Sequence, residues 1–394
     1  MIKQKKLKIL VITNLFPNNK EPNRGIFIKQ AVHELARLCE LQVVAPVPWM
    51  PKICSAQYIY ADINQIEFID GIKVYHPRWL VTPKICRSIY GFLFYLSLLR
   101  NIKKIQQDFY FDVIYAPWVY PDGFGSVLLG KCLNKPVILH ALGCDVNQYT
   151  KYFIRRHLIA WALGKAKFII SVSKAIKDTI IKLGIRCDQI FVIPTGVNTA
   201  VFRNIDKTQC RHELGLSDDE KIILFVGSFE HVKGINYLLE AFVLFIRRYI
   251  PHVRLIMIGK GNMKAEIITF IEQNKLQQCV TIVGEVDHDN ISTWMNAADI
   301  FCLPSIREGT PNVILEALAC GKPIVATSVG GIPDILNRSG ESILVPPRDA
   351  QSLAGAFERI FATSNEWKCF NVSAKVVSWK EHAEMIFDIL KNAT

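Results

Sequence analysis

The sequence lacks a hydrophobic run long enough to cross a membrane. Its most apolar stretch, Tyr90 to Leu99, falls well short of the ~20 residues that a membrane-spanning helix needs. A short apolar segment near the start, residues 9–12, is too brief for the core of a secretion signal and is interpreted as a first buried strand. We therefore expect a protein without transmembrane segments.

Signatures of several other protein classes are missing as well. The eleven cysteines include no Cys-x-x-Cys pair and no histidine cluster accompanies them, so we expect reduced thiols in a cytoplasmic protein rather than disulfides or a zinc site. No Gly-x-Gly-x-x-Gly follows a predicted strand, the nearest match being residues 259–262, which argues against a dinucleotide oxidoreductase. No motif for nucleic acid is present either.

Negative charge is scarce in the first half of the chain. Residues 1–200 contain 27 Lys and Arg against 12 Asp and Glu, a net charge of +15, whereas residues 201–394 contain 20 against 23, a net charge of −3. The 394 residues are 50% hydrophobic and 21% charged, which is typical of a globular protein with a large core, and their number favours two domains. The uneven charge indicates that the two halves meet different partners.

Short apolar runs alternate with helical patterns, which is typical of parallel sheets with helices on both faces. Strands are predicted at residues 8–13, 41–46, 112–117, 136–141, 168–173 and 190–195, and again at 221–227, 253–259, 279–284, 299–304 and 323–327. Helices include Ile28–Cys39, Ile235–Tyr249 and Pro311–Ala319. The polar region 198–217 separates two α/β domains with doubly wound parallel sheets, residues 1–200 and 201–375, whose ligands should bind beyond the carboxyl ends of the strands.

A strand, a tight loop and a helix follow one another between residues 299 and 321. Thr310 can cap this helix, Pro311 suits its first turn and Gly321 its end. Free N–H groups at such a helix start bind anions. Glu308 and Glu316, which flank the helix start, are not suited to binding an anion and must have another role.

Lys233 lies directly before a glycine and a predicted helix in the loop of residues 227–239. A lysine at this point can reach a phosphate that is held at the start of a neighbouring helix. An ordinary surface turn would show the same residue, so spacing alone does not assign a role to it.

Two segments of the second half, FVGSFEHVKG at residues 225–234 and the run from His288 to Leu336, resemble the donor-binding domain of the retaining glycosyltransferases of family 4. The Glu-x7-Glu spacing, the Gly-x-Pro-Asn loop and the following Gly-Gly-Ile-Pro-Asp match in order. Residues 22–27, 140–146 and 193–198 resemble the family more weakly. The resemblance implies the GT-B fold, in which two Rossmann-like domains face each other across a cleft and a C-terminal helix, here about 376–394, packs back on the first domain.

The resemblance also implies that the donor is a nucleoside-diphosphate sugar. Glu308 matches the residue that contacts the transferred sugar, and Glu316 matches the carboxylate that accepts hydrogen bonds from the ribose hydroxyls, for which an acceptor-only group is suited. The implied donor-binding residues are Gly25, Gly227, Ser228, Lys233, Glu308, Gly309, Thr310, Pro311, Asn312, Val313 and Glu316, and the implied catalytic residues are His140, Glu308 and Lys233.

Three of the matched positions carry an open question. His140 matches a histidine near the transferred sugar, although a histidine whose hydrogen bonds are satisfied inside the core would fit the same strand end. Asp145, on the same loop, could bind sugar or acceptor. Ser228 stands where the family often has arginine, so Lys233 and the helix start would carry the charge of the leaving group without it.

The implied reaction passes through an oxocarbenium-like transition state, and hydrogen-bond donors fixed at the diphosphate should supply most of the acceleration. The resemblance implies retention by same-face attack, with the leaving phosphate helping to deprotonate the acceptor, and implies no metal or other cofactor. The one Asp-x-Asp triplet, Asp287–Asp289, is interpreted as a helix start rather than a metal site.

The basic first half is expected to carry the acceptor, a glycan or a lipid-linked molecule of cell-surface polysaccharide or glycolipid biosynthesis. Residues 83–105 and 151–167 mix Lys and Arg with aromatic and aliphatic residues, which suits an anionic membrane surface at its inner face but equally suits ordinary amphipathic helices. Two alternative functions stay open: a GT-B sugar-nucleotide epimerase, and a membrane-associated subunit that has kept the fold without activity.

Overall fold

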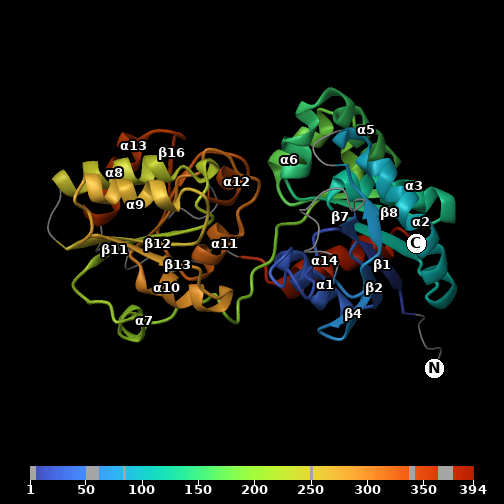
Figure 1. The fold of residues 1–394 in the computed structure, drawn as a ribbon, viewed down its shortest axis with the longest axis horizontal. Coiled ribbons are helices and arrows are strands. Elements are labelled where there is room, and N and C mark those ends of the chain that lie inside the picture. Colours follow the sequence, from blue (N-terminus) through green and yellow to red (C-terminus); the bar gives the residue numbers. More distant parts are fainter. Residues whose placement is uncertain (1–5, 50–61, 83–85, 249–251, 337–341, 363–375) are drawn as a thin grey trace. The chain divides into compact units, whose positions relative to one another are not determined.

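The computed structural model describes residues 6–49, 62–82, 86–248, 252–336, 342–362 and 376–394. The chain divides into two compact units (Figure 1): Met1–Gly196 with Trp379–Thr394, the N-terminal domain, and Val197–Ser378, the C-terminal domain. The sequence-based boundaries were 200/201 and 375/376. Residues 83–85 of the predicted membrane segment and Tyr249 of a predicted helix lie outside the described residues.

The N-terminal domain is built on an eight-stranded sheet with the order β10-β9-β8-β7-β1-β2-β5-β4, parallel except for the outer pair β4 and β5. Its strands are β1 (Lys8–Ile12), β2 (Glu40–Val44), β4 (Ile66–Ile69), β5 (Ile72–Tyr75), β7 (Val113–Pro117), β8 (Val137–Ala141), β9 (Phe168–Ser171) and β10 (Ile190–Val192). β3 (Val47–Trp49) and β6 (Arg78–Leu80) form a separate parallel pair. The six strands predicted for this half are confirmed.

Four short strands of this domain were not predicted, for two different reasons. β4 and β5 form a hairpin through Asp70 and Gly71, whose φ angles are 50° and 79°. Asp-Gly between two alternating runs is a recognised hairpin signal, so the sequence did contain the information. β3 and β6 have three residues each, too few for periodicity to identify a strand.

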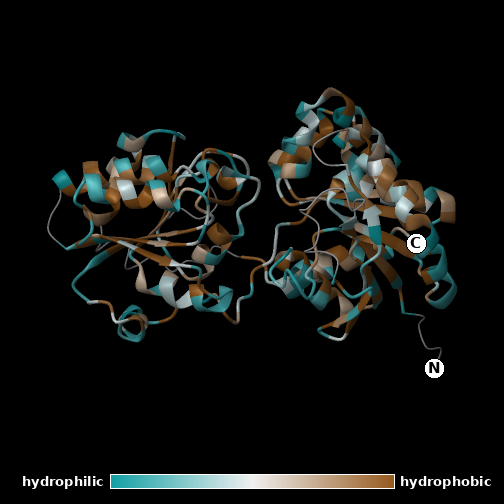
Figure 2. Cartoon of the chain, viewed as in Figure 1, coloured by the Kyte–Doolittle hydropathy of each residue, from teal (hydrophilic) through white to brown (hydrophobic). Residues whose placement is uncertain are grey.

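The central strands are apolar along their whole length because helices cover both faces of the sheet. Leu10 and Ile12 belong to the core beneath the helices on one face, whereas Ile9 and Val11 belong to the core beneath those on the other. The first group is α2 (Tyr90–Asp108), α3 (Phe124–Leu133), α5 (Phe153–Lys165) and α6 (Lys174–Ile181), and the second is α1 (Ile26–Ala36) and α14 (Trp379–Lys391). Figure 2 shows these strands as a hydrophobic layer.

Shorter helical pieces of the N-terminal domain lie in its loops: α4 (Cys144–Asn147), the 3-10 turns η2 (Arg87–Ile89), η4 (Tyr149–Lys151) and η5 (Cys187–Gln189), and the wider turn η3 (Val119–Gly123). The C-terminal helix α14 packs on α1 through Ala383, Ile386 and Leu390. It therefore completes the core of the first domain, although most of the chain separates the two helices.

The C-terminal domain is built on a six-stranded parallel sheet with the order β13-β12-β11-β14-β15-β16. Its strands are β11 (Lys221–Val226), β12 (Val253–Ile258), β13 (Val280–Gly284), β14 (Ile300–Leu303), β15 (Ile324–Thr327) and β16 (Ser342–Val345); its helices are α7 (Lys207–Leu214), α8 (Ile235–Arg248), α9 (Lys264–Gln273), α10 (Ile291–Ala297), α11 (Asn312–Ala319), α12 (Ile332–Leu336) and α13 (Ala350–Ala362), with 3-10 turns η6 (His231–Lys233) and η7 (His288–Asn290). The five predicted strands are confirmed, and β16 was missed.

Strand order reverses beside β11 in the second sheet, because β12 follows on one side and β14 on the other. In the first sheet the same reversal occurs beside β1, which has β2 on one side and β7 on the other. Loops that leave neighbouring strands in opposite directions at such a point open a crevice at the carboxyl edge of the sheet. The loops after β11 and β14, and those after β1 and β7, are therefore where ligand-binding residues are expected.

Membrane-spanning helices and disulfides were not expected from the sequence. None of the helices there is both long and apolar enough to cross a membrane. Nine cysteines lie in this part of the chain, and all nine are free thiols.

Candidate functional site

Two loops meet at the switch point of the C-terminal domain. The loop after β11 ends in η6 and the loop after β14 begins at Pro304; the N–H of Ile306 donates to the carbonyl oxygen of Val232 at 2.8 Å. Gly234 has a φ of +67°, and a Cβ atom at this position would lie 2.0 Å from the carbonyl oxygen of Pro304. Glycine is therefore required for the two loops to approach so closely.

This approach places Lys233 beside Glu308, although 75 positions separate them in the sequence. Nζ of Lys233 donates to Oε1 of Glu308 at 2.6 Å, and Oγ of Ser305 donates to the same oxygen at 2.7 Å. The two charged side chains are only 21% and 10% exposed. Partial burial strengthens the attraction between them, so this pair forms a fixed polar centre at the carboxyl edge of the sheet.

The Gly-Gly-Ile-Pro-Asp motif supports this loop from the other side. Gly330 has a φ of +58°, and a Cβ atom there would lie 2.2 Å from the carbonyl oxygen of Glu308. The N–H of Gly331 donates to the carbonyl oxygen of Gly309 at 2.7 Å. The motif therefore fixes the backbone that carries Glu308.

The start of α11 differs from the sequence-based expectation. Pro311 is the residue before the helix, with extended backbone (φ −75°, ψ 116°), and α11 begins at Asn312. Thr310 makes no capping hydrogen bond; its Oγ1 is buried and has no hydrogen-bond partner. The predicted cap at Thr310 is therefore wrong, because the proline places the threonine too far from the first turn. The N–H groups of Asn312 and Val313 are in the first turn of the helix and therefore have no acceptor within it. These hydrogen-bond donors and the unpaired hydroxyl of Thr310 lie together at the helix start.

Glu316 lies on the next turn of α11 and is 8% exposed. Its Oε1 is 2.8 Å from Nε2 of His288, in the turn η7 after β13. This hydrogen bond, ahead of the opposing effect of burial, raises the pKa of His288. Asp287–Asp289 lie at a helix start, as predicted, whereas the role of the histidine between them was not predicted. In the described parts of the chain no three His, Cys, Asp or Glu side chains are placed to hold a metal ion.

The loop after β11 is also fixed at its first residues. A Cβ atom at Gly259, whose φ is +142°, would lie 1.9 Å from the carbonyl oxygen of Gly227. The N–H of Phe229 donates to the carbonyl oxygen of Lys260 at 2.7 Å. These contacts hold the backbone of Gly227 and Ser228 in one conformation next to the switch point.

At the switch point of the N-terminal domain, the loop after β1 binds the turn after β7. Asp122 of that turn is fully buried, and its two carboxyl oxygens accept hydrogen bonds from the backbone N–H and the side-chain Nδ2 of Asn14, at 2.6 and 2.8 Å. Burial raises the pKa of Asp122 to about 7. Gly25 has a φ of +59°, and a Cβ atom there would lie 2.2 Å from the carbonyl oxygen of Leu15. Gly25 is therefore required by the packing of the loop after β1 on itself.

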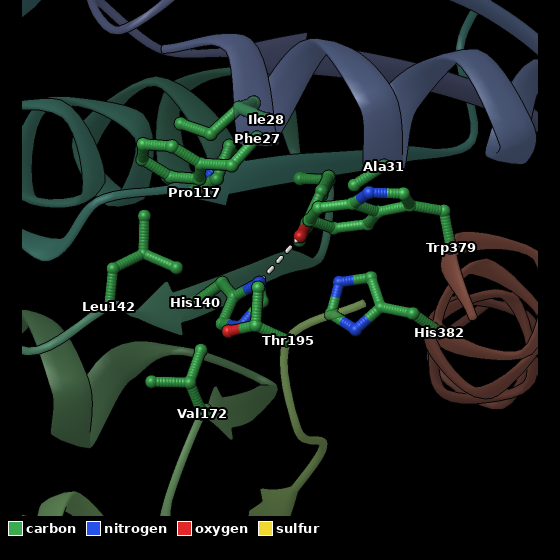
Figure 3. A pocket seen from close by; sticks show the side chains of 11 residues that line it. Phe27, Ile28, Ala31, Pro117, His140, Leu142, Val172, Thr195, Trp379 and His382 are labelled. Atoms are coloured by element: carbon green, nitrogen blue, oxygen red, sulfur yellow. Dashed lines mark hydrogen bonds between the residues drawn. The ribbon is translucent and has the colours of Figure 1, made fainter. Parts of the chain in front are cut away.

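His140 lines a pocket of the N-terminal domain (Figure 3) at the end of β8. Its Nδ1 lies 2.7 Å from the hydroxyl of Tyr115, a fully buried side chain of β7, and its Nε2 is buried without a partner. Burial and the neighbouring His382 hold the pKa of His140 well below its ordinary value, so the ring is neutral. If the Tyr115 hydroxyl donates to Nδ1, only the N–H of Nε2 is left without a partner. If Nδ1 donates to Tyr115 instead, both the lone pair of Nε2 and the hydroxyl proton of Tyr115 are left without partners. Nε2 of His140 therefore carries the proton.

His382 of α14 lines the same pocket, with its ring centre 6.0 Å from that of His140 (Figure 3). Its Nδ1 lies 2.7 Å from the carbonyl oxygen of Pro194, which can only accept. Burial lowers the pKa of His382 to about 4, so this ring is neutral too, with the proton on Nδ1. His382 was not predicted from the sequence, because no motif marks it and 188 positions separate it from Pro194.

Asp145, which was considered as a contact to sugar or acceptor, has its hydrogen bonds within the loop that follows β8 and with the turn after β7. The side chain is fully buried at the start of α4, and its oxygens accept hydrogen bonds from the backbone N–H groups of Val119, Leu142, Gly143 and Val146. Four backbone amides on one carboxyl group hold the loop after β8 in place, and a contact of Asp145 with sugar or acceptor stays a prediction.

Models of two protein families match the chain along almost its whole length. The model described as Glycosyltransferase Family 4 matches residues 25–201, and the model described as Glycosyl transferases group 1 matches residues 206–375. This chain is a glycosyltransferase. The prediction of a glycosyltransferase of this family type is confirmed, and the first half, whose resemblance was weaker, matches a glycosyltransferase family model as well.

Relatives of this glycosyltransferase cover much of its length. It is 28% identical over 370 residues, 92% of this chain and 91% of the relative, to a candidate teichuronic acid biosynthesis glycosyltransferase, TuaC, of Bacillus subtilis (strain 168). It is 30% identical over 279 residues, 67% of this chain and 65% of the relative, to the D-inositol 3-phosphate glycosyltransferase of Pseudarthrobacter chlorophenolicus.

Solved structures agree in fold. The sucrose-phosphate synthase of Thermosynechococcus elongatus aligns with a TM-score of 0.77 at 21% identity, covering 98% of this chain and 99% of that one. HepE of Anabaena, in complex with UDP-glucose, aligns with a TM-score of 0.72 at 18% identity, covering 98% of this chain and 100% of that one. The glycosyltransferase therefore has the GT-B fold, as predicted, with two parallel-sheet α/β domains.

Proposed function

We propose that this glycosyltransferase takes a nucleoside-diphosphate sugar as donor and transfers the sugar, with retention of its anomeric configuration, to a glycan or lipid-linked acceptor. The observation that supports the donor most directly is the pair of Lys233 and Glu308 next to the start of α11. A cation and free amides suit a phosphate group, and a carboxylate suits sugar hydroxyls. A nucleoside-diphosphate sugar carries its phosphate next to its sugar hydroxyls, so a single donor molecule can contact all of these groups.

The diphosphate is assigned to Lys233, to the N–H groups of Asn312 and Val313, and to the hydroxyl of Thr310. The buried Oγ1 of Thr310 has no partner within the protein, so a ligand oxygen can satisfy it. Lys233 exchanges Glu308 for a phosphate oxygen when the donor binds, which leaves Glu308 for the hydroxyls of the transferred sugar. Ser228 contributes a neutral contact where an arginine would add a charge.

The ribose of the nucleotide is assigned to Glu316. Oε1 is engaged by His288, and the other carboxylate oxygen remains for the ribose diol. HepE, whose fold this chain shares, has been solved with UDP-glucose, which makes a uridine nucleotide the natural one to test before others.

The reaction breaks the bond between the anomeric carbon and the diphosphate oxygen, and forms a bond from the same face to the acceptor oxygen. The acceptor proton passes to the departing phosphate, so charge and atoms balance without a further cofactor. Negative charge grows on the diphosphate during this step, and donors already aimed there stabilise the transition state by roughly 3–4 kcal/mol each in comparable sites. We propose that Lys233 and the helix start do this without a metal ion.

His140 is proposed to lie next to the transferred sugar and to act as a hydrogen-bond donor. In the tautomer fixed by Tyr115, Nε2 has a proton to share and no lone pair to accept one. His140 is therefore suited to orient a sugar hydroxyl and unsuited to act as a general base. Proton transfer to the leaving phosphate is consistent with this property.

The acceptor is assigned to the N-terminal domain, which carries the positive charge of the chain. The similarity to TuaC, whose name places it in teichuronic acid biosynthesis, supports an acceptor from cell-surface polysaccharide synthesis. We propose a peripheral location at the inner face of the membrane, where such acceptors are assembled.

Thermal unfolding in the presence of UDP-, GDP- and ADP-sugars tests the donor. One donor class should raise Tm, the rise should survive a metal chelator, and it should be absent in Glu316→Ala. Turnover of that donor with a glycan acceptor should give a product whose anomeric proton coupling in NMR matches the donor. A donor converted to its epimer without acceptor would contradict the proposal and support an epimerase, and inversion would contradict retention.

A further inference from the structure

Large apolar side chains are exposed at the beginning of two helices of the N-terminal domain. Three consecutive residues at the start of α5, namely Tyr152, Phe153 and Ile154, are 58%, 78% and 59% exposed. At the start of α2, and in the turn before it, Ile89, Phe92 and Leu96 are 44%, 45% and 65% exposed and recur at helical spacing on the outer face. A water-soluble helix normally has polar residues at such positions.

The two helices lie on the same face of the sheet. Both contribute to the same core cluster, and α3 lies between them (Figure 1). Phe124 of α3 contacts both neighbours: its ring centre is 4.8 Å from that of Phe92 in α2 and 5.1 Å from that of Trp161 in α5. The exposed groups at the two helix starts therefore belong to one side of the domain.

Both helix starts also lie at the carboxyl edge of the sheet. α2 ends at Asp108 and leads into β7 at Val113, and α5 ends at Lys165 and leads into β9 at Phe168. A helix that precedes a parallel strand ends at the amino edge of the sheet, so its first residues lie at the carboxyl edge. His140 lies in the last two residues of β8, the strand between β7 and β9, and therefore close to that edge. We call Ile89, Phe92, Leu96, Tyr152, Phe153 and Ile154 together the apolar rim.

The charge around the apolar rim has one sign. Residues 86–107 contain the basic residues Arg87, Arg100, Lys103 and Lys104 and no Asp or Glu. Residues 146–177 likewise contain no Asp or Glu, and their basic residues are Lys151, Arg155, Arg156, Lys165, Lys167, Lys174 and Lys177. The guanidinium of Arg155 lies 4.5 Å from the ring centre of Tyr152, so apolar and cationic groups are interleaved.

We propose that the apolar rim inserts into the headgroup region of a bilayer that contains anionic lipids, with the surrounding Lys and Arg side chains on the lipid phosphates. Exposed aromatic and aliphatic side chains within a field of positive charge match this surface in both polarity and charge. A protein partner would need an acidic surface of equal extent. The insertion holds the carboxyl edge of the N-terminal sheet against the membrane. This rests on the proposed function in one respect, namely that the acceptor at that edge is lipid-linked.

Co-sedimentation with two kinds of vesicle tests the proposal. The full chain should bind vesicles of equal parts phosphatidylcholine and phosphatidylglycerol, and bind vesicles of phosphatidylcholine alone at least several-fold more weakly. The double variant Phe153→Ser with Ile154→Ser should reduce binding to the anionic vesicles roughly tenfold or more, since two inserted side chains are lost. Arg156→Gln should weaken binding less, and its effect should disappear at high salt.

Phe68 provides a matched control, because it is 72% exposed on the edge strand β4 of the same domain and lies outside the apolar rim. Phe68→Ser should bind anionic vesicles as the wild type does. Equal binding by the double variant and the wild type, equal binding to both vesicle types, or no binding at low salt would each overturn the proposal. The Tm rise with nucleotide sugar separates this result from the proposed function: it should be retained in the double variant, and its absence from the wild type would instead contradict the assigned donor site.

Discussion

Nε2 of His288 lies 2.8 Å from Oε1 of Glu316, and the side chain of this glutamate is only 10% exposed. The ring of His288 also contacts Phe202, at 5.1 Å between ring centres, so its position is fixed on two sides. The histidine comes from the loop after β13 and the glutamate from α11, which makes His288 a positioning residue for the proposed ribose contact.

His288→Ala should raise KM for the donor about 10- to 100-fold with little change in kcat, the range found when the hydrogen-bonded partner of a metal ligand is removed. Asp289→Ala is the control, because this carboxylate is 75% exposed and 4.0 Å from the imidazole. Steady-state kinetics with varied donor distinguishes the two. An unchanged KM in His288→Ala would contradict the positioning role.

The same contact predicts a pH dependence of stability. Because Glu316 raises the pKa of His288 in the folded state, the protonated ring stabilises the fold fully below the unfolded value of about 6.5, and this contribution is lost as pH rises through the raised pKa. Glu316 and Asp289 are the charged groups found next to the ring. The difference in unfolding free energy between wild type and His288→Ala, measured by denaturant titration, should therefore be larger at pH ~6 than at pH ~9.

Lys233 and Glu308 should have separable effects on binding and turnover. Lys233→Ala should remove the Tm rise with nucleoside diphosphate and lower kcat about 100- to 1,000-fold, because charge on the leaving group loses its cation. Glu308→Gln should keep nucleoside diphosphate binding and lose turnover, because the amide retains the shape but loses the negative charge and one of the two acceptor oxygens offered to the sugar hydroxyls. Lys260→Ala, which breaks an exposed pair with Glu285, is the matched control. Identical behaviour of Lys233→Ala and Lys260→Ala would exclude the assignment.

Tyr115 should determine the tautomer of His140. Tyr115→Phe removes the hydroxyl 2.7 Å from Nδ1 and should let the ring proton redistribute between the two nitrogens. Imidazole 15N chemical shifts should show the Nε2–H form in the wild type and a mixture in the variant, with kcat lowered roughly tenfold if His140 donates to the sugar. Tyr75→Phe, in the same sheet, should change neither. A wild-type spectrum with the proton on Nδ1 would reverse the assignment.

Glycine should be required at position 330 because the backbone of Glu308 lies so close, and not only because φ is positive there. Gly330 and Gly215 both have positive φ, 58° and 66°, but a Cβ atom would collide with the Glu308 carbonyl oxygen only at Gly330, since nothing lies within 4 Å of Gly215. Both alanine variants should lose about 1 kcal/mol of stability from the strained angle. Only Gly330→Ala should also lose the Tm rise with donor. Equal donor binding by the two variants would show that this loop does not position Glu308.

The order of strands and helices could be predicted from local patterns of apolar residues. The candidate site residues that lie in one long motif could also be predicted from the local sequence. β11 and β14 are continuous apolar runs because helices cover both faces of their sheet, and such runs are visible without knowledge of the fold. Glu308, Glu316 and the glycines between β14 and α12 lie within one stretch of chain, so their resemblance to the family's motifs could be recognised in the sequence. β3 and β6, with three residues each, carried too little pattern.

Tertiary structure alone decided which side chains hold the candidate site residues in place. His288, Tyr115 and His382 reach Glu316, His140 and Pro194 across gaps of 28, 25 and 188 positions, and no local pattern reports such a contact. The burial of Asp145 and its hydrogen bonds from four backbone amides could not be predicted for the same reason. Hydrophobic periodicity records which face of an element is covered, whereas the pairing of polar groups depends on which elements fold together. The sequence therefore determined the architecture and the family, and only the packed chain determined the protonation and contacts of its candidate site.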